Sequence, residues 1–269
     1  MTVAPPLRRP RAADGPAAVL SALRRVGQRP VYWPYLAVPM LVFAVLSATA
    51  LAVTFFVARP ALDAALGSTS GVAWFDRALV ALGTLGAALL ALFACALAAT
   101  PLSAPALETL VRYTSQDLGL PPHPQLTFLQ ELGCGLRAQT AALLWTAPVW
   151  VLLFAVDLAL PFLLPLTTGL RALLAAFGIA WALIDYPLTL HGVGVRERLR
   201  LLRRALRPVL GFGATFAVLF WIPCCGLAWI GVGVVGATEL VARLAASDPE
   251  WRAALGRGRA QPGSSATPS

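Results

Sequence analysis

The stretch LAVPMLVFAVLSATALAVTFFV, residues 36–57, decides the fold class, because none of its 22 side chains is charged. At about 1.5 Å per helical residue, it is long enough to cross a hydrocarbon core of about 30 Å. Tyr32, Trp33 and Tyr35 precede it, and such aromatic residues are typical of the membrane–water interface. The stretch therefore predicts a membrane-spanning helix.

The composition extends this interpretation to the whole chain. Apolar residues make up 58% of the sequence and the mean hydropathy is +0.75. Charged residues make up only 12%, against about 25% in soluble domains. The basic residues, all arginine, outnumber the acidic ones by 21 to 12, which is typical of loops that face anionic lipid. We expect membrane lipids as partners, and not nucleic acid.

Further apolar runs predict the other membrane segments. Residues 79–99 are long enough for a second full span. Residues 138–184 carry only two charges and fit a helical hairpin, with a turn at Pro161, Pro165 and residues 167–169.

The last apolar run, residues 208–238, is broken by IPCCG at 222–226. As one helix it would be about 46 Å long, too long for the membrane, whereas each half alone is too short. We therefore expect a re-entrant hairpin with a break within two residues of Pro223. The predicted fold class is an all-α integral membrane protein with two long transmembrane helices, two shorter hairpins and amphipathic helices at the interface.

Two amphipathic stretches complete the pattern. In residues 106–118, apolar positions fall on one side of a helix, which should lie in the interface plane. Val195, Leu199, Leu202 and Leu206 repeat at helical spacing in an arginine-rich segment, whose arginines should face lipid phosphates or solvent.

Arginine counts predict the orientation in the membrane. The first 30 residues and the segment 196–207 hold six arginines each, and four more lie from Arg243 onward. The loop between the first two spans has two arginines balanced by two acids. Both termini should therefore be cytoplasmic. We divide the chain into a loosely ordered basic arm (1–30, helical over 17–26), a membrane domain (31–245) and a disordered tail (246–269).

Isolated charged residues leave alternatives open. Asp157 either faces the protein interior with a partner such as Arg171 or a pore, or it lies in water near the hairpin turn. Glu239 and His191 are expected at the interface, and His191 could carry protons only if it is buried. We expect the helix before His191 to end or kink at Pro187, with Asp185 facing the arginines that follow.

Motifs for catalysis are not evident. The sequence has no GxSxG or HExxH pattern. GVGVVG at 231–236 follows no predicted strand, so it indicates close helix packing and not a dinucleotide site. We expect no enzymatic activity, no cofactor and no metal site.

Several segments resemble one membrane protein family. DYPLTLHGVGVRERLRLLRR (185–204), FGATFAVLFWIP (212–223) and GVGVVGATEL (231–240) are similar, in this order, to the CysZ sulfate permeases and the wider EI24-domain family. APALETL (104–110) is similar to the Ala-Pro step that follows the second span in this family. The resemblance implies two long spanning helices, two short hairpins, homo-oligomers and a bacterial inner membrane. The matching residues are Pro105, Glu108, Asp185, Tyr186, Pro187, His191, Phe212, Gly213, Ile222, Pro223, Gly236, Ala237 and Thr238.

One departure bears on function. The resemblance implies a pair of anion-binding arginines just before the first long span, where this chain has Trp33 and Pro34. We predict a permease or channel for a small inorganic anion such as sulfate. The alternative is a non-transporting scaffold or assembly protein of the inner membrane. The candidate anion contacts are Arg29, Arg137, Arg171 and the backbone near Pro223 and Gly226.

Overall fold

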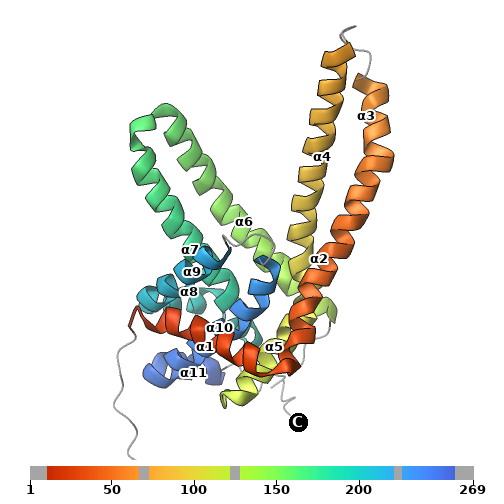
Figure 1. Cartoon of the computed structure of the whole chain (residues 1–269). Coiled ribbons are helices and arrows are strands. Elements are labelled where there is room, and N and C mark those ends of the chain that lie inside the picture. Colours follow the sequence, from red (N-terminus) through yellow and green to blue (C-terminus); the bar gives the residue numbers. More distant parts are fainter. Residues whose placement is uncertain (1–10, 67–72, 122–127, 221–225, 258–269) are drawn as a thin grey trace, which may run out of the picture. The chain divides into compact units, whose positions relative to one another are not determined.

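The computed structural model describes residues 11–66, 73–121, 128–220 and 226–257, which contain helices and no strand (Figure 1). The chain forms two compact units. One comprises residues 37–104, and the other comprises the residues on either side, Met1–Leu36 and Pro105–Ser269. Each unit is described separately.

The unit of residues 37–104 is built on two long apolar helices. Helix α2 (Trp33–Val53) continues through a π-helical segment (Thr54–Ala58) into α3 (Arg59–Leu66), and α4 covers Ala73–Leu102. Candidate spans cover Pro30–Ala65 and Trp74–Ala99, which confirms the two predicted long helices. Both helical stretches extend beyond the uncharged runs, and in the first of them the π segment keeps the backbone helical past Val57.

The larger unit contains the predicted helical hairpin. Helix α6 (Phe128–Ala159) and α7 (Leu164–Leu190) are joined by a short 3₁₀ turn, Pro161–Leu163. The expected turn was too long, since residues 167–169 lie inside α7. Pro165 falls in the first turn of α7, where a missing backbone N–H costs nothing, so the helix can begin there.

The helix before His191 does not end at Pro187, and the alternative, a kink at this proline, stays a prediction. Helix α7 continues through Pro187 to Leu190. The hydroxyl of Thr189 donates to the Asp185 carbonyl (2.7 Å), and the His191 N–H donates to the Pro187 carbonyl (3.2 Å). These bonds complete the last turn in spite of the proline. Gly192, with φ +68°, then reverses the chain.

The core of the larger unit contains residues of α5 (Ala104–Asp117), α7 and five further helices. The additional helices are α1 (Asp14–Gln28), α8 (Val195–Arg204), α9 (Leu206–Phe220), α10 (Gly226–Ser247) and α11 (Pro249–Arg257). Helix α1 packs against α9 and α10, and α7 packs against the same two helices.

The described parts of both terminal segments are helical and packed on the core. The helix expected over residues 17–26 of the basic arm is present as α1, and its Ala18, Val19 and Ala22 are fully buried. Helix α11 falls in the tail that we expected to be disordered, and its Trp251 is fully buried. Their apolar side chains account for this order, because each helix covers part of the shared core.

Glycines bring the core helices close together. A Cβ atom on Gly213 of α9 would collide with the backbone carbonyl of Ala176 in α7. A Cβ on Gly233 would lie 2.8 Å from Leu183, and one on Gly236 would lie 3.2 Å from the Phe212 ring. The interpretation of GVGVVG as a packing motif is therefore confirmed.

The amphipathic segments are helical, but their faces differ from those expected. Helix α5 (Ala104–Asp117) buries Leu107, Leu110 and Val111 in the protein core, so this face does not lie against lipid. Helix α8 buries Leu201 and Leu202, whereas Val195 and Leu206 are exposed. Its buried stripe is therefore shifted around the helix from the predicted one.

The second hairpin is described only in its two arms. Helix α9 ends at Phe220 and α10 begins at Gly226. Ile222 and Pro223 lie outside the described residues, so the re-entrant break stays a prediction.

Candidate anion site

The candidate site begins with two arginines at the end of α1. Arg25 and Arg29 are one helical turn apart, and the Arg29 N–H donates to the Arg25 carbonyl (3.1 Å). Positive charges are favourable at a helix C-terminus. Arg29 has an extended backbone, and Pro30 directly after it begins a 3₁₀ turn, Pro30–Tyr32. The chain thus passes from α1 into the first candidate span, Pro30–Ala65, within two residues.

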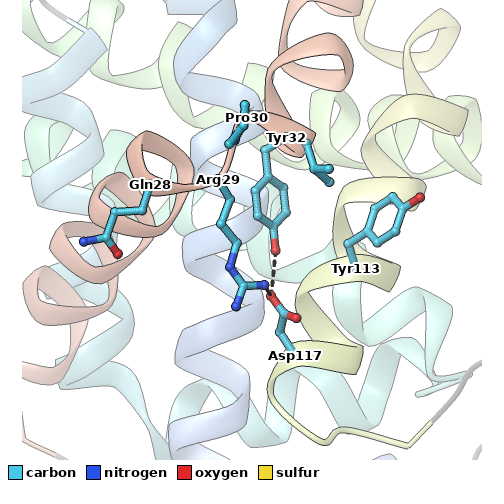
Figure 2. A pocket seen from close by; sticks show the side chains of 7 residues that line it. Gln28, Arg29, Pro30, Tyr32, Tyr113 and Asp117 are labelled. Carbon is cyan, nitrogen blue, oxygen red and sulfur yellow. Dashed lines mark hydrogen bonds and ion pairs between the residues drawn. The ribbon is translucent and has the colours of Figure 1, made fainter.

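Both arginines reach the same carboxylate, that of Asp117 at the end of α5. Arg29 pairs with Asp117 Oδ2, and the Nη1 of Arg25 lies 3.3 Å from the same oxygen. The hydroxyl of Tyr32 also donates to it (3.1 Å), as Figure 2 shows. The hydrogen bond from Arg29 is the main cause that lowers the pKa of Asp117. Asp117 is therefore ionised at neutral pH.

A pocket of about 270 Å³ opens beside this cluster (Figure 2). The side chain of Arg29 is 53% exposed there, and the Tyr113 ring forms part of the wall. Guanidinium and phenol groups are both donors that suit the oxygens of an anion. The residues that line the pocket are Gln28, Arg29, Pro30, Val31, Tyr32, Tyr113 and Asp117.

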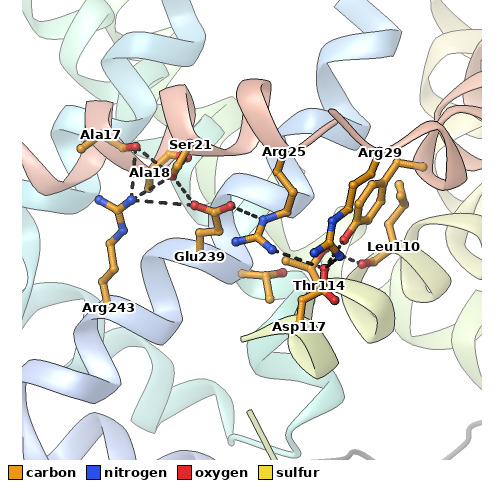
Figure 3. Close-up of polar contacts among 12 residues, drawn as sticks. Ala17, Ala18, Ser21, Arg25, Arg29, Leu110, Thr114, Asp117, Glu239 and Arg243 are labelled. Atoms are coloured by element: carbon orange, nitrogen blue, oxygen red, sulfur yellow. Dashed lines mark hydrogen bonds and ion pairs between the residues drawn. The ribbon is translucent and has the colours of Figure 1, made fainter. Parts of the chain in front are cut away.

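The ion-pair network continues from Arg25 into the core (Figure 3). The Nε of Arg25 donates to Glu239 Oε1 (2.7 Å), and the Ser21 hydroxyl donates to Glu239 Oε2. Arg243 lies 3.8 Å from Glu239 and donates to Ser21 (2.9 Å). The expectation that Glu239 is interfacial is wrong, because its side chain is only 4% exposed. The reason is that α1 covers this face of α10.

The charges of this network leave an excess of positive charge. Arg25, Arg29 and Arg243 oppose two carboxylates, Asp117 and Glu239, so three positive and two negative charges give +1. The site can therefore attract one more negative charge.

Among the other predicted anion contacts, the described side chain of Arg171 does not line this pocket. Arg171 pairs with Asp157, which also accepts a hydrogen bond from Thr167. The alternative in which Asp157 has Arg171 as its partner is therefore supported, and the Asp157 side chain is only 13% exposed although it lies close to the α6–α7 turn. Arg137 belongs to α6, but its side chain is outside the described residues, as is Pro223. Gly226 is the first residue of α10.

Three described residues that match the family pattern make contacts within the larger unit. Asp185 pairs with Arg198 of α8, which confirms that it faces the arginines of the following helix. Glu108 pairs with Arg112 one turn later, and Thr238 donates to the Val234 carbonyl (2.8 Å).

His191 is buried in the larger unit, one residue after the candidate span of α7 ends at Leu190. Its Nδ1 lies 2.7 Å from the Pro187 carbonyl, and the residue is 3% exposed. Burial lowers the pKa of His191, although backbone contacts with Pro187 and Pro121 partly offset this effect. The imidazole is therefore mainly neutral at pH 7.

Sequence reasoning missed four residues of the site: Arg25, Tyr32 as a polar contact, Tyr113 and Asp117. The spacing of four between Arg25 and Arg29 was visible and indicates a shared helix face. The partnership with Asp117 was not visible, because it joins residues almost 90 positions apart.

These features define the class of the protein. By length and composition, four helices in the described part of the chain could cross a membrane: Pro30–Ala65, Trp74–Ala99, Pro161–Leu190 and Trp229–Ser247. The protein is an all-α membrane protein. Residues 18–230 match the family described as Sulfate transporter CysZ/Etoposide-induced protein 2.4, and the chain belongs to this family. No curated protein matches the chain.

Proposed function

We propose that this protein is a permease or channel for a small inorganic anion, with sulfate as the first candidate. The observation that carries the proposal is the position of Arg29, which lines a pocket and directly precedes the first candidate span. We further propose that it acts without enzymatic chemistry in the bacterial inner membrane, with both termini in the cytoplasm.

The chemistry of the pocket suits an oxyanion. A guanidinium group presents several N–H donors in one plane and binds tetrahedral oxyanions through paired hydrogen bonds. The side chain of Arg29 is half exposed, so it can turn toward an incoming ion. Arg25, one turn earlier, supplies a second positive charge. The pair precedes the first span, although it lies upstream of the positions that the family resemblance implies.

Asp117 is central to the proposed mechanism, because its carboxylate forms an ion pair with the guanidinium group of Arg29. An incoming anion must share or replace this contact. Asp117 therefore acts as an internal competitor that keeps the affinity moderate, and a transporter must also release the ion that it binds.

Uptake of labelled sulfate into liposomes that contain the purified protein tests the proposal. Arg29→Gln should reduce uptake at subsaturating sulfate about fivefold, as expected for the loss of one exposed charged contact. Asp117→Asn should raise sulfate affinity, because it removes the competitor and increases the local charge. Arg24→Gln is the matched control, since Arg24 is an exposed arginine of the same helix.

The two variants are expected to change affinity in opposite directions, so general damage to the fold cannot produce the full result. Uptake by the unmodified protein no greater than by empty liposomes would reject sulfate transport. If uptake of other small anions is also no greater than by empty liposomes, the alternative function, a non-transporting scaffold, is favoured. Normal uptake by Arg29→Gln would show that Arg29 does not contact the transported anion, although the protein would still be a transporter.

A further inference from the structure

Helix α8 has one face that contacts the protein. Leu201, Leu202 and Ala205 are buried, and Arg198 on the same side pairs with Asp185 of α7. The Nε of Arg198 also donates to the Val193 carbonyl (2.6 Å). These contacts hold α8 against the end of α7.

Three arginines lie on the opposite face of α8. Arg196, Arg200 and Arg203 are spaced i, i+4 and i+7, which places them in one stripe along a helix. All three are exposed. The side chain of Arg200 is 64% exposed, and its ion pair with Glu197 is long, at 3.7 Å. The stripe thus presents positive charge to its surroundings.

An apolar edge runs beside this stripe. Val195 is 67% exposed and Leu199 is partly exposed, and both lie between the buried face and the arginines. Leu206, directly after α8, extends the edge and is 42% exposed. On the other flank, Arg204 pairs with Asp248 and Glu250 near α11. The apolar edge therefore adjoins the arginine stripe on one flank only.

The position of α8 along the chain sets its level relative to the membrane. The candidate span of α7 ends at Leu190, and only four residues separate it from the start of α8. The contact from Arg198 back to Asp185, which lies within that span, keeps α8 beside the span's end. Because the headgroup layer begins where a spanning helix ends, the end of this candidate span, with α8 beside it, is where lipid phosphates are expected.

We infer that α8 is a docking surface for anionic phospholipid, such as phosphatidylglycerol, in the membrane that holds the protein. The arginine stripe binds headgroup phosphates, and the edge of Val195, Leu199 and Leu206 enters the boundary of the acyl chains. The apolar edge favours a lipid over a free phosphate ion, because only a lipid has chains to cover it. This inference is independent of anion transport.

The test measures the thermal unfolding midpoint of the full-length protein in detergent as lipid is added. Phosphatidylglycerol should raise the midpoint more than phosphatidylcholine does, and the difference should shrink at high salt. In a variant with Arg196→Gln, Arg200→Gln and Arg203→Gln, the apparent affinity for phosphatidylglycerol should fall about fivefold per arginine removed. Lysine at the same three positions keeps the positive charge, so this variant should retain most of the affinity for phosphatidylglycerol.

Two further arms separate lipid from free anion. Inorganic phosphate should not raise the unfolding midpoint as phosphatidylglycerol does. The single variant Val195→Ser should reduce the rise in the midpoint that phosphatidylglycerol causes. If the triple variant is not recovered folded, Arg196→Gln alone gives the same test with a smaller expected change. Equal stabilisation by both lipids, an unchanged response in the Gln variants, or full stabilisation by inorganic phosphate would each overturn the inference.

Discussion

Glu239 shows how strongly one residue depends on its neighbours. Its side chain is 4% exposed and bonds to Arg25 and Ser21. Loss of one partner from a buried ion pair costs about 3–5 kcal/mol, because the other charge stays unpaired. Arg25 is 22% exposed, so solvent screens part of this cost, and we expect Glu239→Gln to lower the free energy of unfolding by about 1–3 kcal/mol.

A double-mutant cycle measures this coupling. Chemical unfolding in detergent is measured for Glu239→Gln, Arg25→Gln and the double variant. The double variant should lose less free energy of unfolding than the sum of the losses in the two single variants. Strict additivity would show that the two side chains do not stabilise each other.

Asp117 gives a prediction on pH. Its pKa is lowered in the folded protein, chiefly by the hydrogen bond from Arg29. A carboxyl group with a lowered pKa stabilises the fold above its unfolded pKa, about 3.9, and this contribution is lost as the pH falls through the folded value. The unfolding midpoint of the unmodified protein should therefore fall more steeply below about pH 4 than that of Asp117→Asn. Parallel pH profiles would contradict the pairing.

At the scale of elements, the crossing of α7 and α9 depends on Gly213. A Cβ at this position would collide with the Ala176 carbonyl, and a backbone atom cannot turn aside as a side chain can. We expect Gly213→Ala to lower the free energy of unfolding by about 1–3 kcal/mol, as overpacking usually does. Thermal unfolding in detergent measures the change.

Gly178 provides the control within α7. A Cβ there meets no atom within 4 Å, and alanine favours a helix by about 1 kcal/mol over glycine. Gly178→Ala should therefore leave the unfolding midpoint unchanged or raise it. Equal losses in the two variants would show that the close helix crossing is not the cause.

At the scale of the whole molecule, the arginine distribution predicts orientation. After replacement of the four cysteines, single cysteines near positions 10, 200 and 255 should react only with reagents that reach the cytoplasmic side. A cysteine at position 68 should react from the outside. Labelling of positions 68 and 200 from the same side would overturn this topology.

The spanning helices and the family pattern could be recognised from the sequence. A long uncharged run has no stable alternative to a helix in lipid, because every backbone polar group must be bonded internally. This argument holds for residues 36–57 without any knowledge of neighbours. It does not locate helix ends well, since a proline such as Pro187 can be accommodated when nearby groups complete the last turn.

The sequence by itself therefore determined that the protein lies in lipid, that its backbone is helical and that arginines are concentrated on one side of the membrane. Only the tertiary structure decided which charges meet. Arg25, Asp117 and Glu239 come from three helices far apart in the sequence, and their partnership depends on how α1 packs. Local patterns carry hydrophobicity and helical period, but ion pairs over such distances follow from packing, which no short stretch of sequence contains.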